Sequence, residues 1–187
     1  MSARVDLVDP TAAPILARRF FSTVGETSPI VRALAQVPEL LAPTMAFLRV
    51  VLGASAIDER TKELVILRVS ATASCSYCIA AHRVAAADSG VTADESAALL
   101  GRSPLDKVFS AHDRSILAVA DAIAAGGEVP AGVISDLRRR SGSHGVIEIV
   151  LVASATLMLN RFCTALGVPI TEATMARLVE LDRPVRA

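Results

Sequence analysis

Hydrophobic residues recur along this chain at the three- and four-residue spacing of amphipathic helices, and no segment shows a convincing strand alternation. A long amphipathic stripe runs through residues 105–125 and ends at Gly126. Another helix is expected in residues 12–24, with Ile15 and Leu16 among its inward-facing side chains. The pattern as a whole predicts an all-α bundle of about eight to nine helices.

One predicted helix, residues 61–73, is apolar on nearly every side, which is typical of a helix that several neighbours bury. Its β-branched residues also fit a strand, but the length of the run and the helical pattern around it favour a helix. Asp58 is its expected N-cap, and Ser74 is the expected cap of a second helix over residues 75–89. Gly90 ends that second helix in our prediction.

The chain is predicted to form one domain preceded by a short arm. No low-complexity linker interrupts it, so we expect a flexible arm at residues 1–10 and a single helical domain at residues 11–187. The N-terminus carries charged residues where a secretion signal needs apolar ones, and no apolar run approaches the ~20 residues of a membrane span. We therefore expect a cytoplasmic protein without a membrane partner.

A weak internal echo predicts a duplicated helical hairpin. The fifteen-residue interval from Glu63 to Cys78 recurs between Glu148 and Cys163. In the second copy Asn160 replaces the first cysteine of the pair, and no histidine follows. Any chemistry is therefore expected in the first copy.

The composition narrows the class of protein. The 187 residues are 52% hydrophobic and carry 19 basic and 19 acidic side chains. That apolar content excludes a disordered chain, and the balanced charge argues against a nucleic-acid partner, which normally requires a basic excess. Near-zero net charge also favours self-association.

Two thiols and an imidazole share one face of the helix predicted over residues 75–89. At about 100° per residue, Cys75, Cys78 and His82 fall within an arc of roughly 60°. In a reducing cytosol, a cysteine pair at this spacing is either redox-active or a metal ligand set. Unpaired backbone amides in the first helical turn favour a thiolate at Cys75.

Glu63 is the expected partner of His82. It shares a helical stripe with apolar residues, so its carboxylate should point inward, where a buried charge needs a partner. A hydrogen bond with His82 would meet that need and make the imidazole a better base. An ion pair with Arg60 or Lys62 is the alternative for Glu63, and a simple core position is the alternative for His82.

The motif Glu-x11-Cys-x2-Cys-x3-His in an all-helical chain resembles the AhpD-like alkylhydroperoxidases of the carboxymuconolactone decarboxylase superfamily. The flanking runs agree at residues 58–68 and residues 158–162, and the similarity extends over about residues 35–180. Tyr77 departs from the family pattern, because the best-studied members carry an additional relay histidine at this position.

The resemblance implies a peroxidase that reduces alkyl hydroperoxides through a dithiol/disulfide cycle. Cys78 would attack the peroxide, and the resulting sulfenic acid would condense with Cys75 to a disulfide. His82, steered by Glu63, would act as the base. An external dithiol, lipoyl-bearing or thioredoxin-like in related members, would reduce the disulfide through a more exposed Cys75. The family also implies a trimer or hexamer, and no metal or other cofactor.

Tyr77 and Asn160 are the expected substrate-binding residues, the first through its hydroxyl and the second through its place in the repeat. Cys163 is expected to be a core thiol. Three other functions remain open. The thiols, His82 and Glu63 could bind zinc, the chain could share the lactone decarboxylation found elsewhere in the superfamily, or it could be a redox sensor without catalysis.

Overall fold

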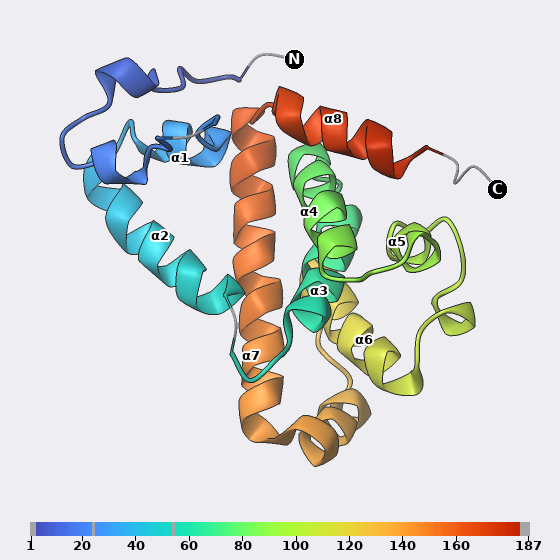
Figure 1. The fold of residues 1–187 in the computed structure, drawn as a ribbon. Coiled ribbons are helices and arrows are strands. Elements are labelled where there is room, and N and C mark those ends of the chain that lie inside the picture. The colour runs from blue at the N-terminus through green and yellow to red at the C-terminus, as the bar shows by residue number, and fades with distance from the viewer. Residues whose placement is uncertain (1–2, 24, 54, 184–187) are drawn as a thin grey trace.

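The computed structural model describes residues 3–23, 25–53 and 55–183, and within them the chain is helical without any strand. The described residues form eight α-helices in one bundle, which confirms the all-α prediction (Figure 1). The helices are α1 (Pro29–Leu34), α2 (Pro38–Leu52), α3 (Glu59–Thr72), α4 (Ser76–Asp88), α5 (Ala93–Leu99), α6 (Ala111–Ala125), α7 (Ala131–Leu166) and α8 (Glu172–Leu181).

Helix α7 is the longest element and the axis of the bundle. It packs against α6, α3, α2 and α4, with α2 on one side and α3 and α4 on the other (Figure 1). Ile149 and Val152 of α7 share the largest core cluster with Val65 and Val69 of α3. Helix α3 is thus buried by several neighbours, as its apolar sequence predicts.

Gly142 interrupts α7 with a φ of 67° and a ψ of 175°. This left-handed φ favours glycine, and a Cβ built here would also lie 2.9 Å from the ring of His144. Gly142 therefore divides α7 into two helical segments at a kink within one long element.

By length and composition, α7 is apolar enough to cross a membrane, in contrast to our expectation that no run of the chain is long enough. The central helix of a soluble bundle has the same composition, because neighbours cover it on several sides. Packing against α2, α3, α4 and α6 accounts for part of this apolar character, because 39% of the most apolar 18-residue window is buried.

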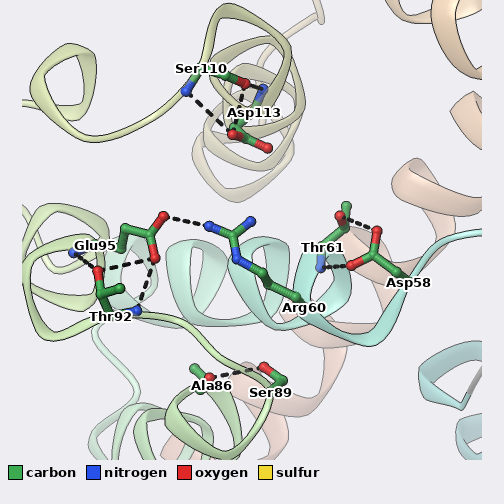
Figure 2. A network of polar contacts seen from close by, with 9 residues as sticks. All are labelled: Asp58, Arg60, Thr61, Ala86, Ser89, Thr92, Glu95, Ser110 and Asp113. Carbon is green, nitrogen blue, oxygen red and sulfur yellow. Dashed lines mark hydrogen bonds and ion pairs between the residues drawn. The ribbon is translucent and has the colours of Figure 1, made fainter.

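Side-chain caps fix where several helices begin (Figure 2). Asp58 accepts a hydrogen bond from the backbone N–H of Thr61 at 2.8 Å, which confirms Asp58 as the N-cap of α3. Thr92 and Glu95 form a capping box at the start of α5, and Glu95 also pairs with Arg60 of α3. Because one carboxylate serves both contacts, the cap of α5 also fixes that helix against α3.

The helix predicted over residues 12–24 is absent from its described part, which forms 3₁₀ turns instead. Ile15 and Leu16, expected to face inward, are exposed. Pro14 explains the difference, because a proline restricts the preceding residue to extended conformations. Ala13 is extended accordingly, with a ψ of 127°.

The helix predicted over residues 105–125 begins only at Ala111. Residues Leu105–Lys107 form a separate 3₁₀ turn, and Ser110 then starts α6 through a capping box with Asp113 (Figure 2). The hydrophobic stripe continues through the break, so hydrophobic periodicity alone does not reveal it.

Part of the expected N-terminal arm is attached to the domain. The backbone N–H of Arg4 donates to the carbonyl of Leu166 at 2.8 Å, at the end of α7. Val8 exchanges two hydrogen bonds with Arg32 of α1, at 3.1 and 3.0 Å. The described residues of the arm therefore lie along α1 and α7.

The internal echo is visible at two helix ends. Helices α4 and α7 each stop at a glycine with positive φ, Gly90 and Gly167. The following residues, Val91 and Val168, donate to the carbonyl five positions back at 2.9 and 3.0 Å. The likeness stops upstream, because the first copy turns between α3 and α4 whereas α7 continues as one helix.

Lys62 is buried where α2, α3 and α7 meet, with 2% of its surface exposed. Its Nζ donates to the carbonyl of Val51 at 2.9 Å and to that of Gly53, and it pairs with Glu148 of α7 at 2.9 Å. These partners offset the cost of removing an ammonium group from water. One side chain thus joins the end of α2 to α3 and α7.

Replacing Lys62 by methionine keeps most of the volume but leaves Glu148 and two carbonyls without their donor. We expect the free energy of unfolding to fall by about 3 kcal/mol, the lower end for breaking a buried ion pair, because Glu148 is partly exposed. Lys107→Met, at an exposed position, should change it by less than about 0.5 kcal/mol. Urea unfolding of both variants measures the difference, and equal stability would contradict the role given to Lys62.

Candidate active site

The first thiol lies where α3 gives way to α4. Ser74 has a φ of 55°, which turns the chain sharply between the two helices. Ser74 is not the cap that the sequence predicts, because Cys75 takes that position. The Cys75 sulfur accepts a hydrogen bond from the backbone N–H of Cys78 at 3.4 Å. This sulfur therefore lies over the unpaired amides of the first turn of α4.

Cys75 and Cys78 face each other across that first turn. Their sulfur atoms are 2.8 Å apart, and both thiols are free. Cys75 is 1% exposed and Cys78 is 5% exposed, so the expectation that Cys75 is the more exposed thiol is wrong. Sulfurs this close can form a disulfide after small side-chain rotations.

Cys163, near the end of α7, completes a group of three thiols. It is buried in one cluster with Cys75, Cys78 and Val168, against which Tyr77 packs. The prediction of a core thiol is confirmed. Its contact with the cysteine pair, however, is not indicated by any local pattern in the sequence.

Hydrogen bonds to the Cys75 sulfur favour its thiolate. The Cys163 thiol and then the Cys78 thiol lower the pKa of Cys75 far below its ordinary value, against the opposing effect of burial. The Cys78 N–H and the Thr164 hydroxyl lower it further. These hydrogen bonds therefore favour the thiolate form of Cys75 at the resting site.

The other two sulfurs keep their protons. Hydrogen bonding to Cys163 and Cys75, with burial, raises the pKa of Cys78. Hydrogen bonding to Cys75, with burial, raises the pKa of Cys163 to about 12. The resemblance predicts that His82 acts as the base for Cys78, whereas these pKa shifts favour the thiolate at Cys75, as the position of Cys75 in the first helical turn predicts.

The predicted pair of Glu63 and His82 is present. His82 Nδ1 and Glu63 Oε2 are 2.9 Å apart, and the two residues lie on the neighbouring helices α4 and α3. A carboxylate only accepts, so Nδ1 carries the hydrogen and Nε2 is left free to accept one. The alternative partners of Glu63 are engaged elsewhere, Arg60 with Glu95 and Lys62 with Glu148.

His82 does not contact the sulfurs directly. Within the described part of the chain, no hydrogen bond joins its ring to Cys75 or Cys78, although Cys78 is one helical turn away. The imidazole is turned toward Glu63 instead. A proton would therefore pass between His82 and the sulfurs through a bound molecule, such as water or the substrate.

A cavity of about 640 Å³ lies beside His82. Its walls are mostly apolar, and Arg19 and Arg49 add two cationic side chains. Among the described residues, its lining includes Ser28 and His82 but neither Cys75 nor Cys78. The cavity is large enough for a small organic molecule, which would meet the imidazole first.

Tyr77 lies between this cavity and the thiols. Its ring packs against the cysteine cluster, and its hydroxyl is 3.3 Å from that of Ser28, which lines the cavity. Burial raises the pKa of Tyr77, so the phenol keeps its proton. Tyr77 is thus well placed to contact a molecule that passes from the cavity toward the sulfurs.

Asn160 is buried between α7 and α3, three residues before Cys163. Its Nδ2 donates to the hydroxyl of Ser70 at 3.2 Å, while its Oδ1 is buried without a partner. The carbonyl of Ser70 in turn accepts from the N–H of Cys75 at 3.1 Å. Asn160 therefore supports the turn that carries Cys75, and substrate binding by Asn160 stays a prediction.

The zinc alternative finds no support in the geometry. Across residues 3–23, 25–53 and 55–183, no group of three or more histidine, cysteine, aspartate or glutamate side chains is arranged to hold a metal ion. The thiols, imidazole and carboxylate form two separate contacts, a thiol cluster and the Glu63–His82 pair.

Comparisons with known proteins agree with this architecture. Residues 38–103 match the model of the carboxymuconolactone decarboxylase family. An uncharacterised peroxidase-related protein with an alkylhydroperoxidase AhpD core from Ralstonia eutropha JMP134 is 17% identical, with a TM-score of 0.80 over 92% of this chain and 94% of that one. A peroxidase-related protein from Silicibacter sp. TM1040 is 22% identical, with a TM-score of 0.77 over 92% and 93%.

A debrominase has the same fold. A cysteine-to-alanine variant of the debrominase Bmp8, solved in complex with 2,3,4-tribromopyrrole, is 20% identical to this chain, with a TM-score of 0.76 over 97% of this chain and 99% of that one. No curated protein sequence matches the chain. At these identities the solved structures establish the fold.

The low pKa of Cys75 predicts a thiolate that persists in acid. An ordinary thiol titrates near pH 8.5, whereas the ultraviolet absorbance of this thiolate should persist far below that pH. Cys75→Ser should abolish the signal. Cys163→Ala should move its loss toward higher pH, because the first donor is gone, whereas Cys163→Ser keeps a donor. A wild-type signal that fades near pH 8.5 would contradict the assignment.

Proposed function

We propose that this chain is an AhpD-like member of the carboxymuconolactone decarboxylase superfamily and a thiol-dependent peroxidase that reduces organic hydroperoxides. The observation that carries the proposal is the pair of sulfurs 2.8 Å apart, one of them a thiolate, close to the Glu63–His82 pair. The apolar cavity beside His82 suits an organic hydroperoxide better than hydrogen peroxide.

Cys78 is the better candidate for the attacking sulfur. It is less completely buried than Cys75 and lies one turn from His82. Its proton can move across 2.8 Å to Cys75, which transfers the charge to Cys78. The Cys78 thiolate then attacks the terminal peroxide oxygen, the O–O bond breaks, and an alkoxide leaves.

The remaining steps consume one proton, which comes from solvent. The Glu63–His82 pair relays that proton to the alkoxide, which departs as an alcohol and leaves a sulfenic acid on Cys78. The Cys75 thiol then condenses with it, so that a disulfide forms and water leaves. Cys75 thus accepts the proton first and resolves the sulfenic acid afterwards.

An external dithiol would restore the pair by thiol–disulfide exchange. Because both sulfurs are buried, the reductant must reach inward past Tyr77. A lipoyl group on a flexible arm meets this requirement more easily than a thioredoxin-like domain, whose reactive thiol sits on a broad surface. Such a cycle needs a reducing compartment, in agreement with the expected cytoplasmic location.

The peroxidase proposal predicts which thiols are needed. With an alkyl hydroperoxide and a dithiol reductant, Cys78→Ser and Cys75→Ser should each lose about 10³-fold or more in turnover. Mass spectrometry of the wild-type protein after one equivalent of hydroperoxide should find a disulfide between Cys75 and Cys78. Full activity in either serine variant would refute the proposal.

The debrominase supplies a second candidate, since it shares the fold. The thiol pair and the apolar cavity would also suit an aromatic halide. Bromide release from 2,3,4-tribromopyrrole, measured beside hydroperoxide consumption with the same dithiol, separates the two functions. Bromide release without hydroperoxide consumption would favour the dehalogenase.

We also propose that the chain assembles with copies of itself. Ile147, Leu151 and Met158 form an exposed apolar stripe on α7, and Phe47 and Val50 are exposed on the adjacent α2. An apolar surface of this kind is typical of a subunit interface. The zero net charge reduces repulsion between copies.

The self-association proposal predicts that charges on this stripe separate the subunits. Wild-type protein should sediment as an oligomer. The double variant Ile147→Lys/Leu151→Lys should sediment as a monomer. Met175→Lys, at an exposed apolar position on α8, serves as the matched control and should remain oligomeric. Equal sedimentation of all three proteins would exclude this stripe as the interface.

A further inference from the structure

We propose that Cys163 is a third redox-active thiol, able to replace Cys75 as the residue that resolves a sulfenic acid on Cys78. This inference rests on the peroxidase function proposed above and adds a step to it. The site would then form either of two disulfides, Cys75–Cys78 within α4 or Cys78–Cys163 between α4 and α7.

The position of Cys163 supports this role. It lies near the C-terminal end of α7, next to the start of α4, and shares a buried cluster with Cys75 and Cys78 (Figure 1). Cys163 is also the first cause of the pKa shifts of both Cys75 and Cys78. A thiol buried in one cluster with both sulfurs of a redox pair is placed for exchange with either one.

Two balanced reactions lead to the second disulfide. The Cys78 sulfenic acid can condense with the Cys163 thiol, so that the S–O bond breaks, an S–S bond forms, and water leaves. Alternatively, Cys163 attacks the Cys78 sulfur of the first disulfide. Cys75 then leaves and takes the proton of Cys163, without further oxidation. The same external dithiol reduces either disulfide.

The negative charge on Cys75 keeps Cys163 protonated and therefore unreactive. While Cys75 is a thiolate, the Cys163 thiol donates to it and has a raised pKa, so Cys163 is a poor nucleophile. Oxidation of Cys75, or its replacement, removes that negative charge. Cys163 then loses the main cause of its raised pKa and becomes available to resolve Cys78.

A second resolving thiol would protect the site. A sulfenic acid that meets a second hydroperoxide before it is resolved becomes a sulfinic acid, which ordinary thiols do not reduce. Because Cys163 is almost fully buried beside the pair, it can capture the sulfenic acid without solvent access.

Peptide mapping separates the two disulfides. Trypsin releases Cys75 and Cys78 together in residues 69–83 and Cys163 in residues 162–177. A Cys75–Cys78 disulfide therefore stays within one peptide, whereas Cys78–Cys163 joins two. The sample is Cys75→Ser treated with one equivalent of cumene hydroperoxide, with dimedone added to trap any sulfenic acid.

We expect Cys75→Ser to yield the joined peptides with little dimedone adduct. The control, Cys75→Ser/Cys163→Ser, should instead carry the adduct on Cys78. If the single variant carries as much adduct as the double variant and no joined peptides, the role of Cys163 is refuted while the peroxidase proposal stands. If Cys78 is oxidised in neither variant, the peroxidase proposal fails as well.

A second measurement uses the intact cysteine pair. Cys163→Ser keeps a hydrogen-bond donor beside Cys75 but removes the second resolving thiol. Under excess hydroperoxide it should accumulate Cys78 sulfinic acid several-fold faster than wild type, because one route of resolution is lost. Equal rates of sulfinic acid formation would refute a protective role.

Discussion

The buried ammonium of Lys62 is the contact on which the arrangement of the helices depends. It satisfies two carbonyls at the end of α2 and a carboxylate on α7, while its own backbone belongs to α3. A charge in this position has few acceptable alternatives, because any shift of one helix leaves a buried polar group unpaired. The next residue, Glu63, is therefore presented to His82 from a helix whose position is well defined.

The groups that control protonation in the site come from two different pairs of helices. Helices α3 and α4 supply the acid–base pair, Glu63 and His82, whereas the charge on Cys75 depends on donors from α4 and α7. The local helix start alone gives Cys75 the hydrogen bond from Cys78 N–H. The largest lowering of its pKa comes from Cys163. Thiol reactivity in this fold is thus a property of the docked helices.

The sequence predicted what depends on helical periodicity. The Glu63–His82 pair and the buried α3 follow from spacing and apolar pattern, and both are present. The capping role of Cys75 was missed because sulfur is a rarer cap than the hydroxyl of Ser74.

The spacing of residues along the sequence could not predict contacts between segments that lie far apart in the chain. Lys62 was considered only as an alternative partner of Glu63, because its actual partners lie in α2 and α7. Cys163 looked like an isolated core thiol because its contact with the pair requires α7 to be docked on α4. The repeat that relates Cys163 to Cys78 is the one signal in the sequence for this contact. Because the second copy lacks the other thiol and the histidine, the sequence predicts no chemistry there.

The distance in sequence between Cys163 and the pair has a consequence for biosynthesis. As the chain emerges, Cys75 and Cys78 can meet within one helix, but the strongest donor to Cys75 arrives only with the last turn of α7. Until α7 docks, Cys75 keeps the hydrogen bond from the Cys78 N–H but lacks the largest cause of its lowered pKa.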